Sequence, residues 1–187
     1  NIKSNKNEIS LEKLTEENIN INQILNKLIK FLCIHIDNQI NAGADVVQIF
    51  DSWAGLLSKD DLPNYCYIPN LKIVEYCKSK KIPVICFPKG IKENYKEFNN
   101  VVKSNGLNLD YEIDPEWAKK NLRNVILQGG LDPKTLFLTN EKLEKCTTKY
   151  LSLFKEMPYI FNLGHGLLPE TDPDKLKGLI KFYREYI

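Results

Sequence analysis

The sequence predicts an α/β protein with about five β/α units, and two architectures fit this pattern: a doubly wound parallel sheet, or the C-terminal portion of a (β/α)8 TIM-type barrel. Five short apolar segments alternate with segments of helical spacing, as in parallel strands joined by crossover helices. The chain has 187 residues, whereas a complete barrel takes about 250. Because the first strand also follows a linker-like segment, we favour the second part of a barrel whose first strands lie elsewhere.

The regular pattern begins at residue 21. Residues 1–20 are rich in Asn, Lys and Glu, and we interpret them as a linker or a ragged start, with disorder as one expectation. Residues 21–43 carry apolar side chains at helical spacing and close on a glycine, which predicts a helix. We therefore expect residues 21–187 to belong to a single domain.

Five strands and five helices then alternate along the chain. Short apolar runs predict the strands, at 45–50, 82–87, 107–112, 124–129 and 159–164. Helical spacing predicts the helices, at 61–81, 92–106, 114–121, 140–157 and 172–187. Gly106 is expected to end the second of these helices, and Pro115 lies near the first turn of the third.

The composition excludes several classes of function. With 26 basic and 24 acidic residues the net charge is +2, too near balance to indicate nucleic acid or a membrane surface as a partner. No apolar run approaches the roughly 20 residues of a membrane-spanning helix. The five cysteines form no CxxC pair, so we expect neither a disulfide framework nor a zinc site, and favour a reducing compartment. The chain does not begin with Met, so a targeting segment could precede it.

Polar residues gather where the predicted strands end. In both architectures the carboxyl ends of the strands meet at one edge of the sheet and carry the chemistry. The residues found there are Asp51, Ser52, Pro88, Lys89, Asp110, Gln128, Gly129, Gly164 and His165. The sequence therefore predicts a polar pocket rim.

His165 is the strongest candidate on this rim, because imidazole gains and loses a proton near neutral pH. The glycines on either side, Gly164 and Gly166, allow unusual dihedral angles and close backbone approach. The structural alternative is a turn whose backbone satisfies the histidine. For His35, which lies within a helical pattern, a structural role is the better interpretation.

Other kinds of site have weak support. Asp51 and Ser52 could bind polar groups of a ligand or cap a turn, but no GxSxG motif surrounds Ser52, so a serine hydrolase is not predicted. Gly129 and Gly130 lack the lysine and hydroxyl of a phosphate-binding loop, which favours a tight turn. The sequence shows no HExxH motif or common zinc spacing, so no metal site is predicted.

Four segments, taken in order, resemble the uroporphyrinogen decarboxylase family: VVQIFDSWAG, IPVICFPKG, NVILQGGLDPKTLF and FNLGHGLLPETDPDKLKGLI. The resemblance runs from residue 21 to the end of the chain. It implies a (β/α)8 barrel that acts as a homodimer in the cytoplasm or in a plastid-type organelle. It also implies removal of the four acetate carboxyls of uroporphyrinogen III, a tetrapyrrole, without a metal or organic cofactor, giving coproporphyrinogen III in haem synthesis.

The resemblance implies substrate-binding roles for four residues. Ser52 matches a serine that contacts the substrate, and His165 matches a histidine that contacts a substrate carboxylate. Phe50 and Phe87 match apolar residues that line the cleft. No catalytic group is identifiable in this segment by the same comparison. The glycines beside His165 would let the backbone turn at the barrel mouth and direct the ring at the tetrapyrrole.

The chain also departs from the family pattern. Gly130 stands where the family usually has Asn. An arginine-rich loop, a carboxylate that binds the pyrrole nitrogens, and a tyrosine have no match here. Uroporphyrinogen carries eight carboxylates, yet only Lys89 is expected at the mouth, with Arg123 at the opposite barrel end and Arg184 in the last helix. We therefore expect this chain alone to be inactive and unstable, with the N-terminal half of the barrel as its missing partner.

Two alternatives remain open. A methyltransferase of the same superfamily would transfer methyl groups through zinc and a corrinoid, and would need His and Cys ligands at strand ends. Cys86 lies inside its strand and has no second ligand beside it. A degenerate homologue would be a binding or scaffold module without catalysis, as the missing basic loop would suggest.

Overall fold

The chain forms a five-stranded parallel sheet whose strands follow one another in sequence order. The computed structural model describes residues 20–186. The strands are β1 (Val47–Asp51), β2 (Val84–Pro88), β3 (Gly106–Leu109), β4 (Ile126–Gly129) and β5 (Tyr159–Ile160). They pair in the order β1-β2-β3-β4-β5. A doubly wound sheet reverses this order at a switch point, so the described chain is built as part of a (β/α)8 barrel.

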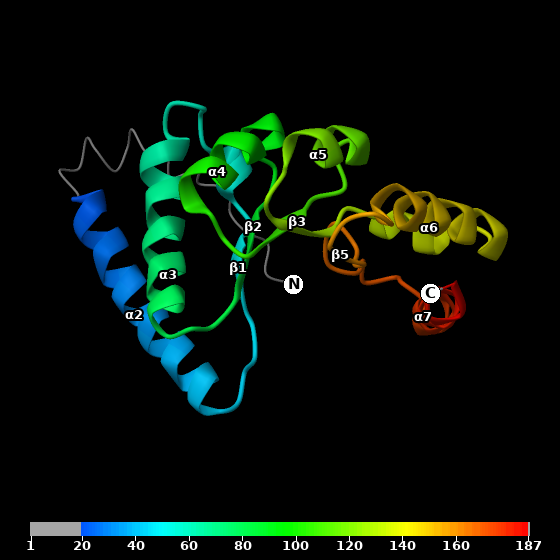
Figure 1. Ribbon diagram of the computed structural model, residues 1–187, viewed down its shortest axis with the longest axis horizontal. Helices are drawn as coiled ribbons and strands as arrows, with labels where there is room; N and C mark the ends of the chain where they lie inside the picture. The colour runs from blue at the N-terminus through cyan, green and yellow to red at the C-terminus, as the bar shows by residue number, and fades with distance from the viewer. Residues whose placement is uncertain (1–19, 187) are drawn as a thin grey trace.

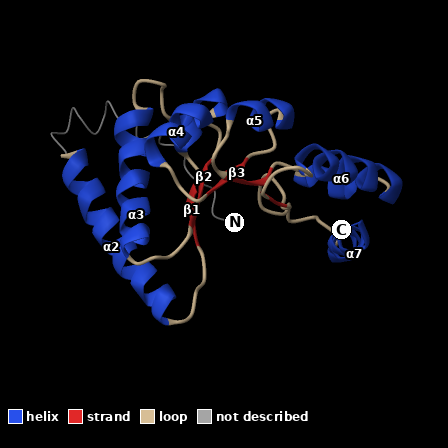
Figure 2. Ribbon diagram, viewed as in Figure 1, coloured by secondary structure: helices blue, strands red, loops and turns tan. Residues whose placement is uncertain are grey.

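The helices lie outside the sheet, as a barrel requires. They are α2 (Ile21–Asn41), α3 (Ile68–Ser79), α4 (Tyr95–Val102), α5 (Pro115–Asn121), α6 (Asn140–Phe154) and α7 (Pro173–Tyr186). In Figure 1 they form an arc around the strands, and Figure 2 shows the strands gathered on the inner side of that arc. Each of α3 to α7 follows one strand, which confirms the predicted alternation.

The helix predicted over 61–81 begins differently. A five-residue π-helix, Pro63–Tyr67, leads into α3, and Pro69 lies in the first turn of α3. Proline has no N–H to donate to the carbonyl of the preceding turn, so that turn widens instead of continuing as α-helix.

Gly106 does not end a helix, contrary to the prediction. α4 ends at Val102, and Lys103 takes the left-handed conformation with φ 53°. Gly106 instead opens β3, opposite Ile85 of β2. A Cβ atom on Gly106 would lie 2.9 Å from Cγ1 of Ile85, so the glycine leaves room for that neighbouring side chain.

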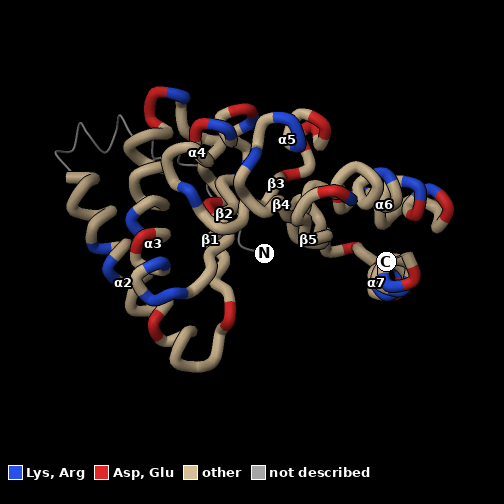
Figure 3. Tube along the Cα trace, viewed as in Figure 1, with Lys and Arg blue, Asp and Glu red and all other residues tan. Residues whose placement is uncertain are grey.

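The main hydrophobic core lies between the sheet and the helices α2 to α6. Its largest fully buried members include Tyr67, Tyr95 and Phe98. A smaller cluster joins the loop after β4 to α6 and α7, through Leu131, Leu136, Leu143 and Leu179. Charged residues lie mainly on the helices and loops (Figure 3), and Asp51 is the single charged residue within the five strands.

The inner face of the sheet is open. Apolar side chains near the strands remain exposed, namely Val46, Phe50, Ile126 and Ile160, at 38–66%. Among residues 20–186, no further strand pairs with the outer edge of β1 or of β5. A half barrel leaves such edges and such a face unpaired.

Three further expectations concern the N-terminal residues, the cysteines and membrane-spanning helices. The expectation for residues 1–20 lies outside the described residues except for Asn20, whose side-chain oxygen accepts a hydrogen bond from the Gln23 N–H at 3.1 Å and caps α2. All five cysteines are free thiols. Within residues 20–186, no helix has both the length and the apolar content to cross a membrane.

A buried carboxylate joins the loops that follow β2 and β3. Asp110 is 2% exposed, and its Oδ2 accepts hydrogen bonds from the Gly90 N–H at 2.8 Å and the Tyr95 hydroxyl at 3.1 Å. Its Oδ1 accepts the Glu112 N–H at 3.0 Å. Burial, and then the charge of Asp110, raise the pKa of Tyr95 well above its ordinary value, so the hydroxyl stays protonated as a donor.

Tyr95→Phe tests this junction. Removing the hydroxyl takes one of three donors from a buried carboxylate, and in the intact polypeptide that contains this sequence we expect a loss of about 1.5–3 kcal/mol in the free energy of unfolding, measured by urea denaturation. Tyr65→Phe is the matched control, because no hydrogen bond of the Tyr65 hydroxyl is found among the described residues. Equal stability of the two variants would contradict the structural role of the Tyr95–Asp110 bond.

Candidate functional site

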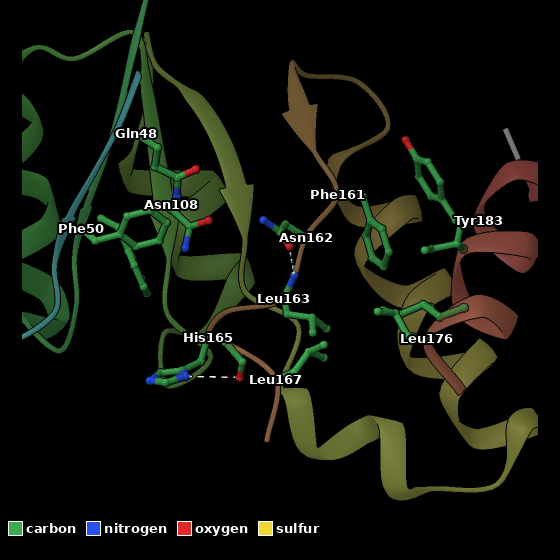
Figure 4. Close-up of a pocket in the computed structure, with 14 residues that line it drawn as sticks. Gln48, Phe50, Asn108, Phe161, Asn162, Leu163, His165, Leu167, Leu176 and Tyr183 are labelled. Carbon is green, nitrogen blue, oxygen red and sulfur yellow. Dashed lines mark hydrogen bonds between the residues drawn. The ribbon is translucent and has the colours of Figure 1, made fainter. Parts of the chain in front are cut away.

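A cavity of about 490 Å³ opens on the inner side of the sheet, between the strands and the segment that leads into α7. Figure 4 shows side chains from β1 and β3 on one side of it, and residues 161–167 with α7 on the other. Its walls are formed by Gln48, Phe50, Phe87, Asn108, Phe161, Asn162, Leu163, His165, Gly166, Leu167, Leu176, Leu179, Ile180 and Tyr183. These walls are apolar apart from three amide side chains, one histidine and one tyrosine hydroxyl.

Two aromatic side chains form one wall. Phe50 and Phe87 are register partners on β1 and β2, so both point to the same face of the sheet. Their rings meet edge to face with centroids 6.1 Å apart. Phe50 is 66% exposed, whereas Phe87 is buried at 5%. The pair offers an apolar surface to a flat or ring-shaped ligand.

His165 lines the same cavity from the segment that follows β5. Its ring lies edge-on to Tyr111, with centroids 6.4 Å apart, and its Nδ1 is 3.3 Å from the carbonyl oxygen of Gly166. A hydrogen bond through Nδ1 leaves Nε2 free for a ligand. The structure therefore brings together Phe50, Phe87 and His165, three residues far apart in the sequence.

Gly164 fixes the position of the segment that carries His165. Its N–H donates to the carbonyl of Leu131 at 2.8 Å, and its backbone packs against the peptide that joins Asp110 to Tyr111. A Cβ atom at Gly164 would lie 2.9 Å from the carbonyl carbon of Asp110 and closer still to the Tyr111 nitrogen. The expectation of close backbone approach is confirmed here. Gly166, however, has open space at its Cβ position.

Ser52 lies beside the cavity and does not line it. It follows β1 in an exposed turn, two residues after Phe50. Three residues after Ser52, the N–H of Gly55 donates to the Lys89 carbonyl at 2.8 Å and joins this segment to the loop after β2. Substrate contact by Ser52 stays a prediction.

Two rim carboxylates have structural partners in place of a ligand. Asp51 turns away from Phe50, as alternate residues of a strand do, and accepts a hydrogen bond from the Asn70 side chain at 3.0 Å. Burial raises the pKa of Asp51, while hydrogen bonds from Cys66 and Asn70 oppose that shift. Asp110 accepts the hydrogen bonds that join the loops after β2 and β3, as described above. Neither carboxylate lines the cavity, so this part of the predicted rim is wrong.

The turn after β4 is built from two glycines in the left-handed region. Gly129 has φ 77° and Gly130 has φ 100°. The carbonyl of Gly130 accepts the Tyr150 hydroxyl at 2.7 Å, and a Cβ atom there would lie 3.0 Å from the Tyr150 ring. The turn is therefore a tight structural turn, as predicted, and Gly130 suits its backbone better than the usual Asn would.

The sequence did not single out the amide side chains on the strands. Gln48, Asn108 and Gln128 are joined by hydrogen bonds, since Nε2 of Gln128 donates to Oδ1 of Asn108 at 2.7 Å and to Oε1 of Gln48 at 3.2 Å. Gln128 was predicted on the rim, but it is 4% exposed and lies beneath the cavity wall. Gln48 and Asn108 are each an amide within an otherwise apolar strand, and this pattern in the sequence could have identified them.

The basic residues lie where the sequence placed them. Arg123 borders a separate hollow next to Val125 and Ile126, at the start of β4 and away from the mouth. Arg184 is exposed on α7, and Lys89 is half-buried directly after β2. No Lys, Arg, Asp or Glu lines the cavity within the described chain. Residues 20–186 also contain no cluster of three or more His, Cys, Asp or Glu side chains suited to a metal.

Comparison with known proteins adds a family relationship. The family model described as uroporphyrinogen decarboxylase (URO-D) matches residues 3–186. The chain is 38% identical to the uroporphyrinogen decarboxylase of Orientia tsutsugamushi (strain Boryong) over 165 residues, which cover 87% of this chain and 48% of that protein. It is 39% identical to that of Rickettsia bellii over 167 residues, covering 88% and 49%. The chain spans about half the length of these curated relatives.

Substituting the two glycines beside His165 separates their roles. Gly164→Ala places a methyl group against the backbone of Asp110 and Tyr111, and we expect it to lower the free energy of unfolding by about 3 kcal/mol. Gly166→Ala should change it by less than about 0.5 kcal/mol. Urea denaturation of the two variants measures the difference. Equal effects would show that the close approach at Gly164 does not hold the loop.

Proposed function

The chain belongs to the uroporphyrinogen decarboxylase family, and we propose that it is the C-terminal part of a (β/α)8 barrel that converts uroporphyrinogen III to coproporphyrinogen III. The proposed step belongs to haem and porphyrin biosynthesis. Support comes from relatives named as this enzyme, at 37–39% identity, of which the chain covers about half. The named relatives favour a decarboxylase over other barrel enzymes.

One observation carries the proposal: a single cavity at the carboxyl ends of the strands combines an aromatic wall with a histidine. A tetrapyrrole presents apolar ring faces and a rim of carboxylates. Phe50 and Phe87 would contact a ring face, while His165, protonated at both ring nitrogens, would donate its Nε2–H to a carboxylate and keep its Nδ1–H on the Gly166 carbonyl. Ser52, exposed in the adjoining turn, would contact the substrate at the edge of the same cavity.

The proposed chemistry needs a proton and a way to hold charge. Each acetate side chain loses CO2 and gains one proton, so that it becomes a methyl group. Protonation of a pyrrole carbon supplies the electron sink, and a carboxylate near the ring would stabilise the positive charge that develops there. We propose that no metal or organic cofactor takes part, because the protonated pyrrole itself accepts the electrons of the breaking C–C bond.

The charges that this chemistry needs would come from outside the described cavity. Eight substrate carboxylates need cationic partners, and residues 20–186 place no Lys or Arg on its walls. Lys89, directly after β2, is a basic residue placed at the strand ends, but it does not line the cavity. We therefore propose that the N-terminal half of the barrel completes the site, in a homodimer located in the cytoplasm or a plastid-type organelle.

A degenerate homologue without catalysis is the second candidate. The uncharged cavity of the described residues favours it, since an acidic substrate would then lack its cationic partners. The methyltransferase alternative has less support, because Cys86 is fully buried within β2 and residues 20–186 contain no cluster of three or more His, Cys, Asp or Glu side chains suited to a metal.

His165→Asn, in the intact polypeptide that contains this sequence, tests the decarboxylase. We expect kcat/KM for uroporphyrinogen, assayed anaerobically, to fall about 10- to 100-fold, the cost of one hydrogen bond to a charged group. His35→Asn is the control, because His35 lies exposed on α2 and is hydrogen-bonded to Gln39 of the same helix. An unchanged rate in the His165 variant would remove His165 from the site, and no turnover by the wild type would favour the degenerate homologue.

The 187-residue chain by itself provides a separate test. We expect it to show no turnover and a broad, low-temperature unfolding transition, because its sheet edges and inner face are uncovered. Adding the N-terminal half of the barrel as a second polypeptide should restore both activity and a cooperative transition, followed by circular dichroism. Full turnover by the chain alone would refute the proposed division of the site.

A further inference from the structure

Three amide side chains are among the polar groups that line the cavity. They are Gln48 on β1, Asn108 on β3 and Asn162 in the segment after β5. Asn108 is buried, at 3% exposure, whereas Gln48 is half-buried and Asn162 is exposed. Buried amides are kept only where their hydrogen bonds are made.

Gln48 is held by its oxygen. Its Oε1 accepts the hydrogen bond from Nε2 of Gln128, which also donates to Oδ1 of Asn108. The amide nitrogen of Asn108 donates to the carbonyl of Leu109 at 3.2 Å. The NH2 group of Gln48, in contrast, finds no acceptor among residues 20–186. The network thus fixes one amide with its acceptor used and its donors free.

Asn162 is held in the same way. Its Oδ1 accepts the N–H of Leu163 at 2.8 Å, a bond marked in Figure 4. The amide nitrogen lies on the side that faces Gln48 and Asn108 across the cavity (Figure 4). This nitrogen, too, has no acceptor within the described part of the chain. Two amides from opposite walls therefore present donors while both of their oxygens are occupied.

We propose that the NH2 groups of Gln48 and Asn162 form an uncharged binding site for one carboxylate of the substrate. This inference rests on the proposed function, which supplies a ligand with eight carboxylates. A pair of donors without a free acceptor selects an anionic oxygen, and hydrogen bonds to a carboxylate are stronger than those between neutral groups.

Gln128 is then a positioning residue. It is 4% exposed and is not among the residues that line the cavity, but its Nε2 fixes which end of the Gln48 amide faces the cavity. Without that donor, the Gln48 amide is free to turn its oxygen toward the carboxylate. Recognition by Gln48 therefore depends on a residue 80 positions away in the sequence.

The test exchanges a donor for an acceptor of the same shape. Asn162→Asp keeps the oxygen that accepts the Leu163 N–H and replaces the NH2 group with a second carboxylate oxygen. In the intact polypeptide at pH 7, we expect the KM for uroporphyrinogen to rise at least tenfold, with kcat within threefold of the wild type. Asn162→Ala, which removes the donor without adding charge, should raise KM only a few-fold.

A pH series separates this role from a structural one. Lowering the pH protonates the new carboxyl, whose pKa the neighbouring substrate carboxylate raises, and restores an O–H donor. The KM of the Asn162→Asp variant, relative to wild type at the same pH, should therefore recover toward pH 5. Asn100→Asp, an exposed change on α4, adds the same charge away from the cavity and should leave KM unchanged.

The outcomes are distinct. An unchanged KM in the Asn162→Asp variant, or equal effects of Asn162→Asp and Asn100→Asp, would overturn the amide site while leaving the decarboxylase in place. A rise in KM that does not recover at low pH would also overturn it. A wild-type protein that does not decarboxylate uroporphyrinogen would overturn both this inference and the proposed function. Thermal unfolding of each variant checks that Asn162, which is exposed, is not needed for folding.

Discussion

Close backbone contact between the loops that follow the strands is the constraint on which the site depends. The loops after β1 and β2 touch at Gly55 and Gly90, where a Cβ atom on Gly55 would lie 2.7 Å from the Gly90 backbone. Gly90 donates its N–H to the carboxylate of Asp110, at the end of β3. Gly164 then packs its backbone against Asp110 and Tyr111. These contacts connect the loops at the barrel mouth to one another, and they position His165 in the same cavity as Phe50 and Phe87.

The two faces of the sheet serve different purposes. The outer face packs against the helices and holds the main core, which supplies most of the apolar burial that stabilises the fold. The inner face carries Phe50, Phe87 and the three joined amides, and within the described residues it remains open to solvent. Strand alternation separates these roles, because Phe50 and Asp51 are neighbours in sequence yet face opposite sides. A single register shift in β1 would therefore exchange the core for the cavity.

The cavity differs in character from a typical site for an acidic ligand. Its polar groups are amides, a histidine and a hydroxyl, and its remaining walls are apolar. Such walls can pack against the apolar faces of a ligand, but they do not neutralise a polyanion. Recognition and charge balance are therefore separate tasks, and in the proposed barrel they fall to different halves of the chain.

Local pattern in the sequence determined the alternation of strands and helices, the parallel sheet, and the placement of His165 and Phe50 at strand ends. Periodicity and turn residues act over a few positions, so a single sequence reveals them. Only the tertiary structure decided that Asp51 and Asp110 accept hydrogen bonds from other parts of the chain, that Gly106 makes room for Ile85, and that Gln128 orients Gln48. Those facts depend on contacts between residues that are distant along the chain, and local periodicity carries no information about such contacts. The strand order likewise excluded the doubly wound sheet, because pairing between strands is settled by packing and not by the pattern of any one strand.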